Sequence, residues 1–270
     1  MVNPQVLKSD VLIIGAGLLG SSVAMGLAKR GCTSVSVVDL DLSGEWSSSE
    51  LNAGGVRATW AQKVNLLTSK FSIEYYASVA EQVGYKDSGY LWLHRPETFD
   101  AALKAREMHV QNGWPVDVLD IAAIKKRYPF IDKTDDLAGA LYGVKDGLLN
   151  PNRLKEHYRE EAMKLGVKFL DGVWVTDSDA TRVNAIQFSD QLSSEKKKHL
   201  LSENPKNVTA GEGSPLTFEA KTIINCAGAW APHLASILGY KSPSEPVRRQ
   251  ISLFHAREVD LTPYGMIIDP

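Results

Sequence analysis

This sequence lacks several features that would place it in a particular class of protein. No apolar run approaches the ~20 residues needed to cross a bilayer. Only two cysteines occur in 270 residues, Cys32 and Cys226, and neither has CxxC or Cys/His ligand spacing, so we predict no disulfide framework and no metal site. A dominant charge is also absent, because 30 basic and 32 acidic residues give a net charge of -2. We therefore expect a small-molecule partner, no nucleic acid and no membrane span.

The first forty residues contain a strand, a glycine-rich turn, a helix and a second strand. Asp10–Ile14 is an apolar run without alternation, which is typical of a strand that is covered on both faces. A helix is predicted from about Leu18 to Lys29, where Gly31 ends it, and a Val-rich strand from Ser34 to Val38 follows. These segments form one complete βαβ unit.

Three glycines in the turn of this unit match a dinucleotide-binding fingerprint. Gly15, Gly17 and Gly20 have G-x-G-x-x-G spacing directly after the first strand, and Asp39 ends the second. Gly15 would permit the tight turn, Gly17 a close approach of the backbone to a diphosphate, and Gly20 close packing of helix and strand. Asp39 would accept hydrogen bonds from ribose hydroxyls, and with Asp41 nearby a 2′-phosphate would be repelled. The alternative is a glycine turn with a structural purpose only.

The remainder of the chain is expected to alternate between helices and strands. Apolar residues with helical spacing from Val64 to Val79 predict one long amphipathic helix over Ala61–Val83. Residues 189–214 are polar and without periodicity, and we expect an exposed hairpin excursion whose lysines, Lys196 to Lys198, are solvated. Further helices are predicted at Glu97–Asn112, Ile121–Arg127 and Pro151–Leu165, and strands at Gly89–Leu93, Leu137–Val144, Lys168–Leu170, Trp174–Ser178, Val183–Phe188 and Thr222–Asn225.

A serine-rich and glycine-rich stretch, Ser47–Arg57, follows the βαβ unit. Its hydroxyl groups can donate to phosphate, and its Gly pair would let the backbone lie against a flat ring. A flexible Ser/Gly loop is the alternative. From the residues alone, the choice between FAD and NAD stays open.

Five segments together resemble the D-amino-acid-oxidase (DAO) superfamily of flavoproteins. The resemblance is greatest to its sarcosine and glycine oxidase-like members and to a mitochondrial FAD-dependent oxidoreductase group associated with complex I assembly. The segments that carry it are Asp10–Asp39, Ser47–Arg57, Ser88–Leu91, Gly143–Pro151 and Ile223–Trp230. It implies an α/β fold, with a Rossmann-type FAD-binding domain and an interleaved mixed-sheet substrate domain. The FAD-binding domain would comprise residues 1–60, about 150–180 and 215–240, and the substrate domain residues 61–149 and 241–270.

The resemblance also implies which residues bind FAD. Those matching the family's cofactor-binding positions are Gly15, Ala16, Gly17, Leu18, Leu19, Gly20, Asp39, Leu40, Ser48, Ser49, Asn52, Gly54, Gly55, Val175, Ala227, Gly228 and Trp230. Arg57 matches a position beside the flavin, and Arg248 a substrate-facing position. These two arginines are the candidates for holding a substrate carboxylate. Trp60 stands where sarcosine oxidases carry a second arginine, which argues against a sarcosine-like substrate.

The activity implied by the resemblance is oxidation of the C–N bond of an amino acid or N-methylated amino acid, by hydride transfer to flavin N5. The alternatives are a non-catalytic FAD-binding scaffold or assembly factor of a respiratory complex, and an NAD-dependent dehydrogenase. The sequence ends at Met266–Pro270, inside a strand-like run where family members continue, so we expect a truncated chain or a second chain that supplies the remainder. The expected location is the cytoplasm in a bacterium and the mitochondrial matrix in a eukaryote.

Overall fold

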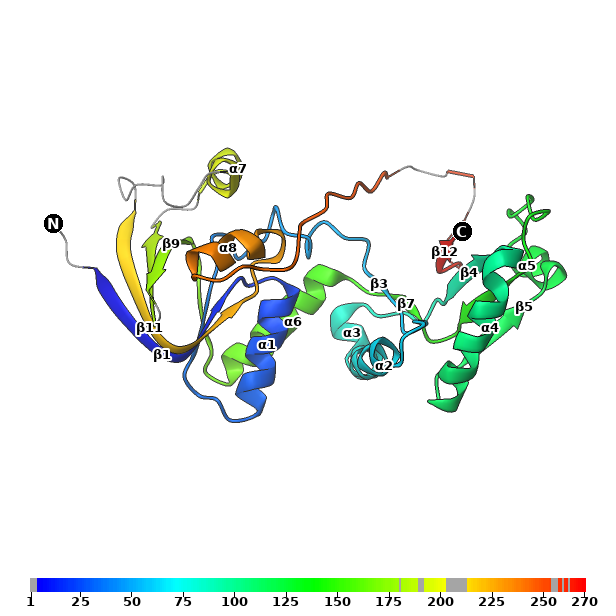
Figure 1. Ribbon diagram of the computed structural model, residues 1–270, viewed down its shortest axis with the longest axis horizontal. Helices are drawn as coiled ribbons and strands as arrows, with labels where there is room; N and C mark the ends of the chain where they lie inside the picture. Colours follow the sequence, from blue (N-terminus) through cyan, green and yellow to red (C-terminus); the bar gives the residue numbers. More distant parts are fainter. Residues whose placement is uncertain are drawn as a thin grey trace. The chain divides into compact units, whose positions relative to one another are not determined.

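The computed structural model describes residues 4–179, 181–188, 192–202, 213–253, 257–258, 260–261 and 263–270 (Figure 1). The chain divides into two compact units. Unit 1 comprises Met1–Asn52 and Leu154–Ile251, and unit 2 comprises Ala53–Arg153 and Ser252–Pro270. The α/β fold class predicted from the sequence is confirmed.

Unit 1 contains a six-stranded sheet in the order β8-β2-β1-β11-β10-β9. Pairing is parallel from β8 to β11 and antiparallel from β11 to β9. The strands are β1 (Gln5–Ile14), β2 (Val35–Val38), β8 (Lys168–Leu170), β9 (Val173–Asp179), β10 (Arg182–Gln187) and β11 (Ser214–Asn225). The helix Leu18–Lys29 (α1) makes the crossover between the parallel strands β1 and β2.

Three turns of unit 1 meet at one edge of this sheet. In the parallel register, Ile14 of β1 lies opposite Val38 of β2 on one side and Asn225 of β11 on the other. The chain leaves these strands into the glycine turn, into Asp39, and into Cys226, respectively. Ligands of open α/β sheets bind outside the carboxyl ends of the strands, so this edge is where a site is expected.

The helices of unit 1 cover the sheet. Leu234 of α8 (Ala231–Ile237) packs in one apolar cluster with Leu12, Ile14 and Phe218 of the central strands. Helix α1 (Leu18–Lys29) contacts β1 and β2, and its buried small residues are Gly20, Ser21, Ala24 and Ala28. Helix α6 (Pro151–Lys164) leads back to β8.

Unit 2 contains a four-stranded sheet, β12-β4-β6-β5, and a two-stranded sheet, β3-β7. Two apolar clusters stabilise it, one around Trp114 and Leu66 and the other around Tyr128 and Leu91. Its strands are β3 (Gly55–Val56), β4 (Tyr90–His94), β5 (Val116–Leu119), β6 (Gly139–Gly143), β7 (Gly147–Leu148) and β12 (Met266–Ile268). Its helices are α2 (Lys63–Ser78), α3 (Ala80–Val83), α4 (Pro96–Gln111) and α5 (Ile121–Arg127).

Two sequence predictions about the segment Ala61–Val83 are wrong. The helix predicted over Ala61–Val83 is two helices, because α2 ends at Ser78 and α3 begins at Ala80. The apolar face assigned to it is also wrong, since Val64 and Phe71 are exposed and Leu66 and Ile73 are buried. Helix α2 has apolar residues on both faces, and spacing alone selected the one that does not pack.

The polar excursion predicted for residues 189–214 is a partial misreading. It contains helix α7 (Ser194–Ser202), and β11 begins at Ser214, while residues 189–191 and 203–212 lie outside the described part of the chain. The prediction of solvated lysines is wrong for Lys197, which is buried. Its ammonium group is paired with an acidic side chain, which is what permits a lysine to be buried.

No helix within the described ranges is long and apolar enough to span a membrane. Within the same ranges, no three His, Cys, Asp or Glu side chains are gathered as metal ligands would be.

Candidate functional site

A cavity of about 560 Å³ lies at the carboxyl edge of the unit 1 sheet. It brings together most of the cofactor-binding residues predicted from the sequence. Those that line it are Gly15, Ala16, Gly17, Leu18, Leu19, Asp39, Leu40, Ser48, Ser49, Asn52, Val175, Ala227, Gly228 and Trp230. Segments that are more than two hundred positions apart in the sequence therefore meet in one cavity.

Each of the three fingerprint positions requires glycine for a different structural reason. Gly15 has a φ of +105°, and a Cβ there would overlap the Cys226 carbonyl group. A Cβ on Gly20 would overlap the Gly15 carbonyl oxygen, so Gly20 lies behind the turn and permits close packing of α1. Gly17 has an ordinary backbone conformation, and a Cβ there would meet only the Ser49 Oγ atom, at 3.0 Å. Of the three, Gly17 is the one whose missing side chain keeps the cavity open.

Asp39 closes the turn from the end of β2. Its Oδ2 accepts a hydrogen bond from the Ala16 N–H at 2.6 Å, and its Oδ1 accepts one from the Asp41 N–H at 3.0 Å. Burial raises the pKa of the Asp39 carboxyl above its usual value, although these two N–H groups and the nearby Arg159 charge oppose the rise. The carboxyl group thus fixes the glycine turn and remains next to the cavity.

A serine from the Ser47–Arg57 stretch contacts the start of α1. The Ser49 Oγ accepts a hydrogen bond from the Leu18 N–H at 2.9 Å. The Asn52 side chain donates to the carbonyl oxygens of Ser48 and Ser49 and holds the loop in this position. The N–H groups of the first turn of α1 have no partner within the helix, and the helix dipole is positive there, so this corner of the cavity favours an anion.

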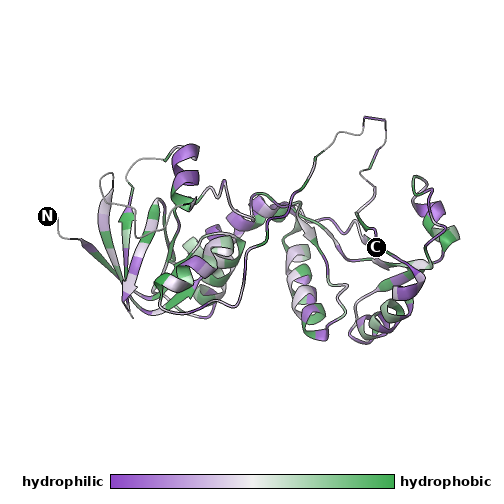
Figure 2. Cartoon of the chain, turned by 45° about the horizontal axis from the view of Figure 1, so that its top comes forward, coloured by the Kyte–Doolittle hydropathy of each residue, from purple (hydrophilic) through white to green (hydrophobic). Residues whose placement is uncertain are grey.

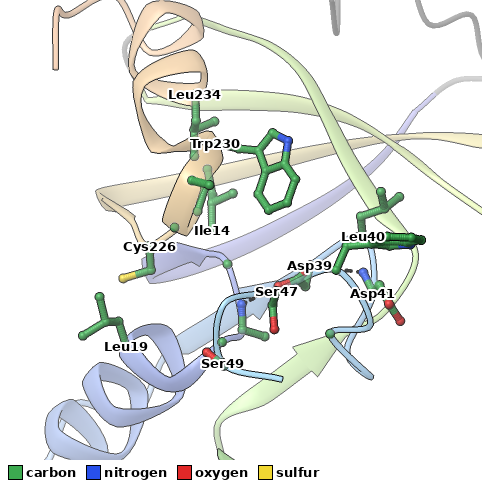
Figure 3. A pocket seen from close by; sticks show the side chains of 18 of the residues that line it. Ile14, Leu19, Asp39, Leu40, Asp41, Ser47, Ser49, Cys226, Trp230 and Leu234 are labelled. Carbon is green, nitrogen blue, oxygen red and sulfur yellow. Dashed lines mark hydrogen bonds between the residues drawn. The ribbon is translucent and has the colours of Figure 1, made fainter. Parts of the chain in front are cut away.

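Apolar side chains form the remainder of the wall. Val173, Trp174 and Val175 come from β9, and Trp230 and Leu234 come from the turn and helix that follow β11. In Figure 3, Trp230 and Leu234 stand on one side of the cavity, and Asp39, Asp41 and Ser47 stand on the other. The cavity therefore has a polar corner at the glycine turn and an apolar part that fits a flat ring.

Sequence reasoning missed two buried cations that line the cavity. Lys155 and Arg159 are one turn apart on α6. The Lys155 Nζ donates to the Ser43 carbonyl oxygen at 2.7 Å and lies 2.9 Å from the Glu50 carboxylate, and the Arg159 Nη2 donates to the Ala16 carbonyl oxygen at 2.7 Å. The i, i+4 spacing of two basic residues was visible in the sequence. The packing of α6 beside the glycine turn was not visible in the sequence.

Three residues of the wall hold a buried nitrogen atom that has no hydrogen-bond partner among the described residues. These atoms are Trp174 Nε1, Arg159 Nε and His233 Nε2. Buried polar groups in native proteins are almost always paired, so unpaired donors around a cavity indicate a polar ligand. A dinucleotide offers phosphate oxygens for the glycine turn and Arg159, and ring nitrogens for the apolar part. The residues present therefore fit FAD.

A second cavity, of about 370 Å³, lies in unit 2 and contains one of the two predicted arginines. The guanidinium carbon of Arg57 lies 4.7, 5.4 and 5.7 Å from the ring centres of Trp60, Trp92 and Tyr90. Its Nε atom is buried and has no hydrogen-bond partner within the described part of the chain. Thr68, Ser69 and Ser72 of α2 also line this cavity. The aromatic rings fix the cation beside hydroxyl groups, which is suited to binding an anion.

The remaining predicted site residues are not part of the first cavity. Gly54 has a φ of +72° and packs against the Leu149 carbonyl group, while Gly55 lines the second cavity and packs against the Tyr90 hydroxyl. These contacts explain why both positions are glycine. Arg248 is exposed in a segment without helix or strand and lines neither cavity, and its role toward a substrate stays a prediction.

Comparisons with known proteins place the chain among FAD-dependent oxidoreductases. FAD-dependent oxidoreductase domain-containing protein 1 of Xenopus laevis is 28% identical over 92% of this chain and 54% of its own length. Monomeric sarcosine oxidase of Streptomyces avermitilis is 27% identical over 85% of this chain and 54% of its own length. This chain therefore spans about half the length of these relatives. Among solved structures, L-proline dehydrogenase from P. horikoshii has the same fold, with a TM-score of 0.68 and 21% identity over 88% of this chain and 57% of its own.

The family description "FAD dependent oxidoreductase" (DAO) matches residues 10–269. That range includes the glycine turn, Asp39, both cavities and both buried cations of α6. The chain belongs to the DAO family of FAD-dependent oxidoreductases.

Proposed function

We propose that unit 1 binds the ADP half of FAD in its cavity and that unit 2 binds the substrate. The observation that carries this proposal is the meeting of the glycine turn, Asp39 and the apolar β9 wall at the carboxyl edge of one parallel sheet. Among open α/β folds this edge is the usual position of a nucleotide. The 560 Å³ volume is of the size expected for a cofactor site.

The diphosphate would lie against Gly17 and the start of α1. The backbone there has no side chain at Gly17, and the positive end of the helix dipole points at the diphosphate. The Ser49 hydroxyl would become a donor once it turns from the Leu18 N–H. Arg159 would add a full positive charge from the other side, through the Nε atom that has no partner. Asp39 would accept from the ribose hydroxyls.

The adenine would occupy the apolar part of the cavity. Val175 would contact it through the β9 backbone, and Trp174 would offer the Nε1 donor that has no partner. Ala227, Gly228 and Trp230 would cover the ribose and diphosphate from the turn after β11. Gly54 and Gly55 belong to unit 2, and we assign them to the flavin half.

The reaction we propose is oxidation of the C–N bond of an amino acid or N-methylated amino acid. A bound flavin would supply the two-electron oxidation as the hydride acceptor for the carbon next to nitrogen, and the resulting imine would be released to water for hydrolysis. Arg57 would hold the substrate carboxylate, because its guanidinium is fixed by three rings and has donors to spare. The rings of Trp60 and Trp92 would exclude water from that ion pair and strengthen it.

The visible spectrum of the purified protein tests this proposal, with anaerobic addition of a panel of amino acids and N-methylated amino acids. Oxidised-flavin bands that bleach with one class of substrate support it. Bands that no amine bleaches favour the non-catalytic scaffold, and a protein that neither holds nor binds added FAD refutes the assignment of the cavity. An Arg57→Gln variant is the matched control, because it should keep its flavin and lose the bleaching.

A further inference from the structure

Helix α7 (Ser194–Ser202) reaches the cavity of unit 1 although most of its residues are hydrophilic (Figure 2). Leu201 lines the cavity directly. Leu200 is buried in an apolar cluster with Leu40 and Trp174, which line the same cavity. The helix therefore packs on the cavity's apolar part and is not a surface element remote from the site.

A buried ion pair attaches this helix to the strand end that carries Asp39. The Lys197 Nζ lies 3.0 Å from the Asp41 Oδ1 and 3.8 Å from the Glu45 Oε2. The side chains of Lys197 and Asp41 are only 8% and 12% exposed, so water screens the pair weakly. Burial acts to raise the pKa of Asp41, but hydrogen bonds from Ser43, Lys197 and the Glu45 N–H outweigh it and hold that pKa below its usual value. Asp41 is thus charged at neutral pH and the pair is intact.

Two tryptophans of the cavity wall depend on the same helix. The Trp230 Nε1 donates a hydrogen bond to the Leu201 carbonyl oxygen at 2.9 Å, which fixes the indole ring. The Lys198 ammonium lies 5.7 Å from the centre of the Trp46 ring. Removing α7 would leave one indole without its acceptor and expose apolar wall residues to water.

We infer that α7 is the outer wall of the adenosine end of the cofactor site, and that the Lys197–Asp41 pair holds this wall in place. The ligand class is the adenosine diphosphate moiety, and the inference rests on the proposed function of the cavity. The pair has a second effect on the site. Lys197 offsets the charge of Asp41, so Asp39 remains the acceptor for ribose hydroxyls. The ion pair also lowers the repulsion that the two nearby carboxylates exert on a diphosphate.

The test uses ADP as a probe in calorimetry, because ADP requires unit 1 only, together with the rate at which bound FAD is released on dilution. Lys197→Met keeps the length of the side chain and removes its charge. We expect ADP affinity to fall about tenfold or more, and FAD release to accelerate by a similar factor, because a buried carboxylate loses its partner. Lys8→Met is the matched control. It breaks an exposed pair with Glu219, 2.9 Å apart in the same unit, and should change neither quantity.

Two further variants keep the inference testable if Lys197→Met folds poorly. Trp230→Phe removes the bond to Leu201 together with part of the indole ring, and should also speed FAD release. In the second variant, an Asn-Gly turn replaces residues 189–212. Gln187 of β10 already lies opposite Ser214 of β11 in an antiparallel pair, so a short turn can close this hairpin without α7. That variant should bind ADP weakly and release FAD fastest.

The outcomes separate this inference from the proposed function. If the unaltered protein binds neither ADP nor FAD, the cavity is not a cofactor site and both ideas are wrong. If it binds both, and the variants bind and release them as the unaltered protein does, α7 is a surface helix and only the inference is overturned.

Discussion

Substitutions at the fingerprint glycines should separate folding from cofactor binding. At Gly17 the backbone φ is −68°, so a valine adopts it without strain, and its Cβ would meet one side-chain atom, Ser49 Oγ, at 3.0 Å. Moving that hydroxyl releases the Leu18 N–H, and loss of such a bond at a helix start costs about 1 kcal/mol. The two methyl groups of valine would then occupy the space for the diphosphate. We expect Gly17→Val to fold and to lose FAD.

Gly20→Ala should do the reverse. Its Cβ would overlap the Gly15 carbonyl oxygen, which is backbone and is already held at a φ of +105°. Such overpacking has no flexible side chain to absorb it and should cost about 3 kcal/mol or more of unfolding free energy. Gly26→Ala on the same helix is the control, since its Cβ would approach nothing closer than the Arg30 Nη1, at 3.5 Å. That change should leave stability equal or raise it by about 0.5–1 kcal/mol.

Urea unfolding of the three variants, with flavin content and FAD affinity measured on each folded protein, checks both expectations. The reasoning fails if Gly17→Val retains full flavin occupancy with unchanged affinity. It also fails if Gly17→Val is destabilised as much as Gly20→Ala, because then the turn has no position that is reserved for a ligand.

Three further predictions concern charged groups. Lys155→Met should lower the free energy of unfolding by about 3 kcal/mol in urea titrations, because it leaves Glu50 and the Ser43 carbonyl group unpaired, whereas Lys164→Met, which breaks an exposed pair, should change it little. Folding lowers the pKa of Asp41, so its ionised carboxylate stabilises the protein above the unfolded-state pKa. This stabilisation is lost as the pH falls through the folded-state pKa. Acid titrations of the free energy of unfolding should show that loss in the unaltered protein and not in Asp41→Asn. Arg57→Lys should raise KM for a carboxylate substrate by about tenfold or more in steady-state assays with FAD content unchanged, since a lysine cannot form a bidentate pair, and an unchanged KM would remove Arg57 from the substrate site.

The βαβ unit could be predicted closely because its signals are local. Val35–Val38 is buried on both faces and reads as an unbroken apolar strand, and Gly15 to Gly20 stand directly between strand and helix. The family resemblance added Val175 and Trp230, which line the cavity but have no local signal. Their place in the site comes from sheet order, which spacing along the sequence does not contain.

Other parts could not be predicted for the same reason. Arg159 and Lys155 look like ordinary surface residues of an amphipathic helix, and only the packing of α6 beside the glycine turn buries them. Lys197 lies in a run of three lysines, and such runs are usually solvated. Its ion pair with Asp41, 156 positions earlier in the sequence, allows it to be buried instead. Helix α2 was assigned the wrong buried face because two stripes of similar apolarity compete on it.

The pairing of β1 with β11 has a consequence for how the protein is made. Gln5 to Ile14 lie beside residues that leave the ribosome about 210 positions later, and β11 is the strand that separates β1 from β10. Before β11 is synthesised, the nascent chain already contains Gly15, Gly17, Gly20 and Asp39. Its β1 then has an unpaired, apolar edge that can pair with other chains. Residues 53–153 of unit 2 are complete much earlier. Synthesis therefore passes through a long interval in which the nucleotide-binding sheet is exposed to aggregation, and chaperone capacity during that interval should limit the yield of folded protein.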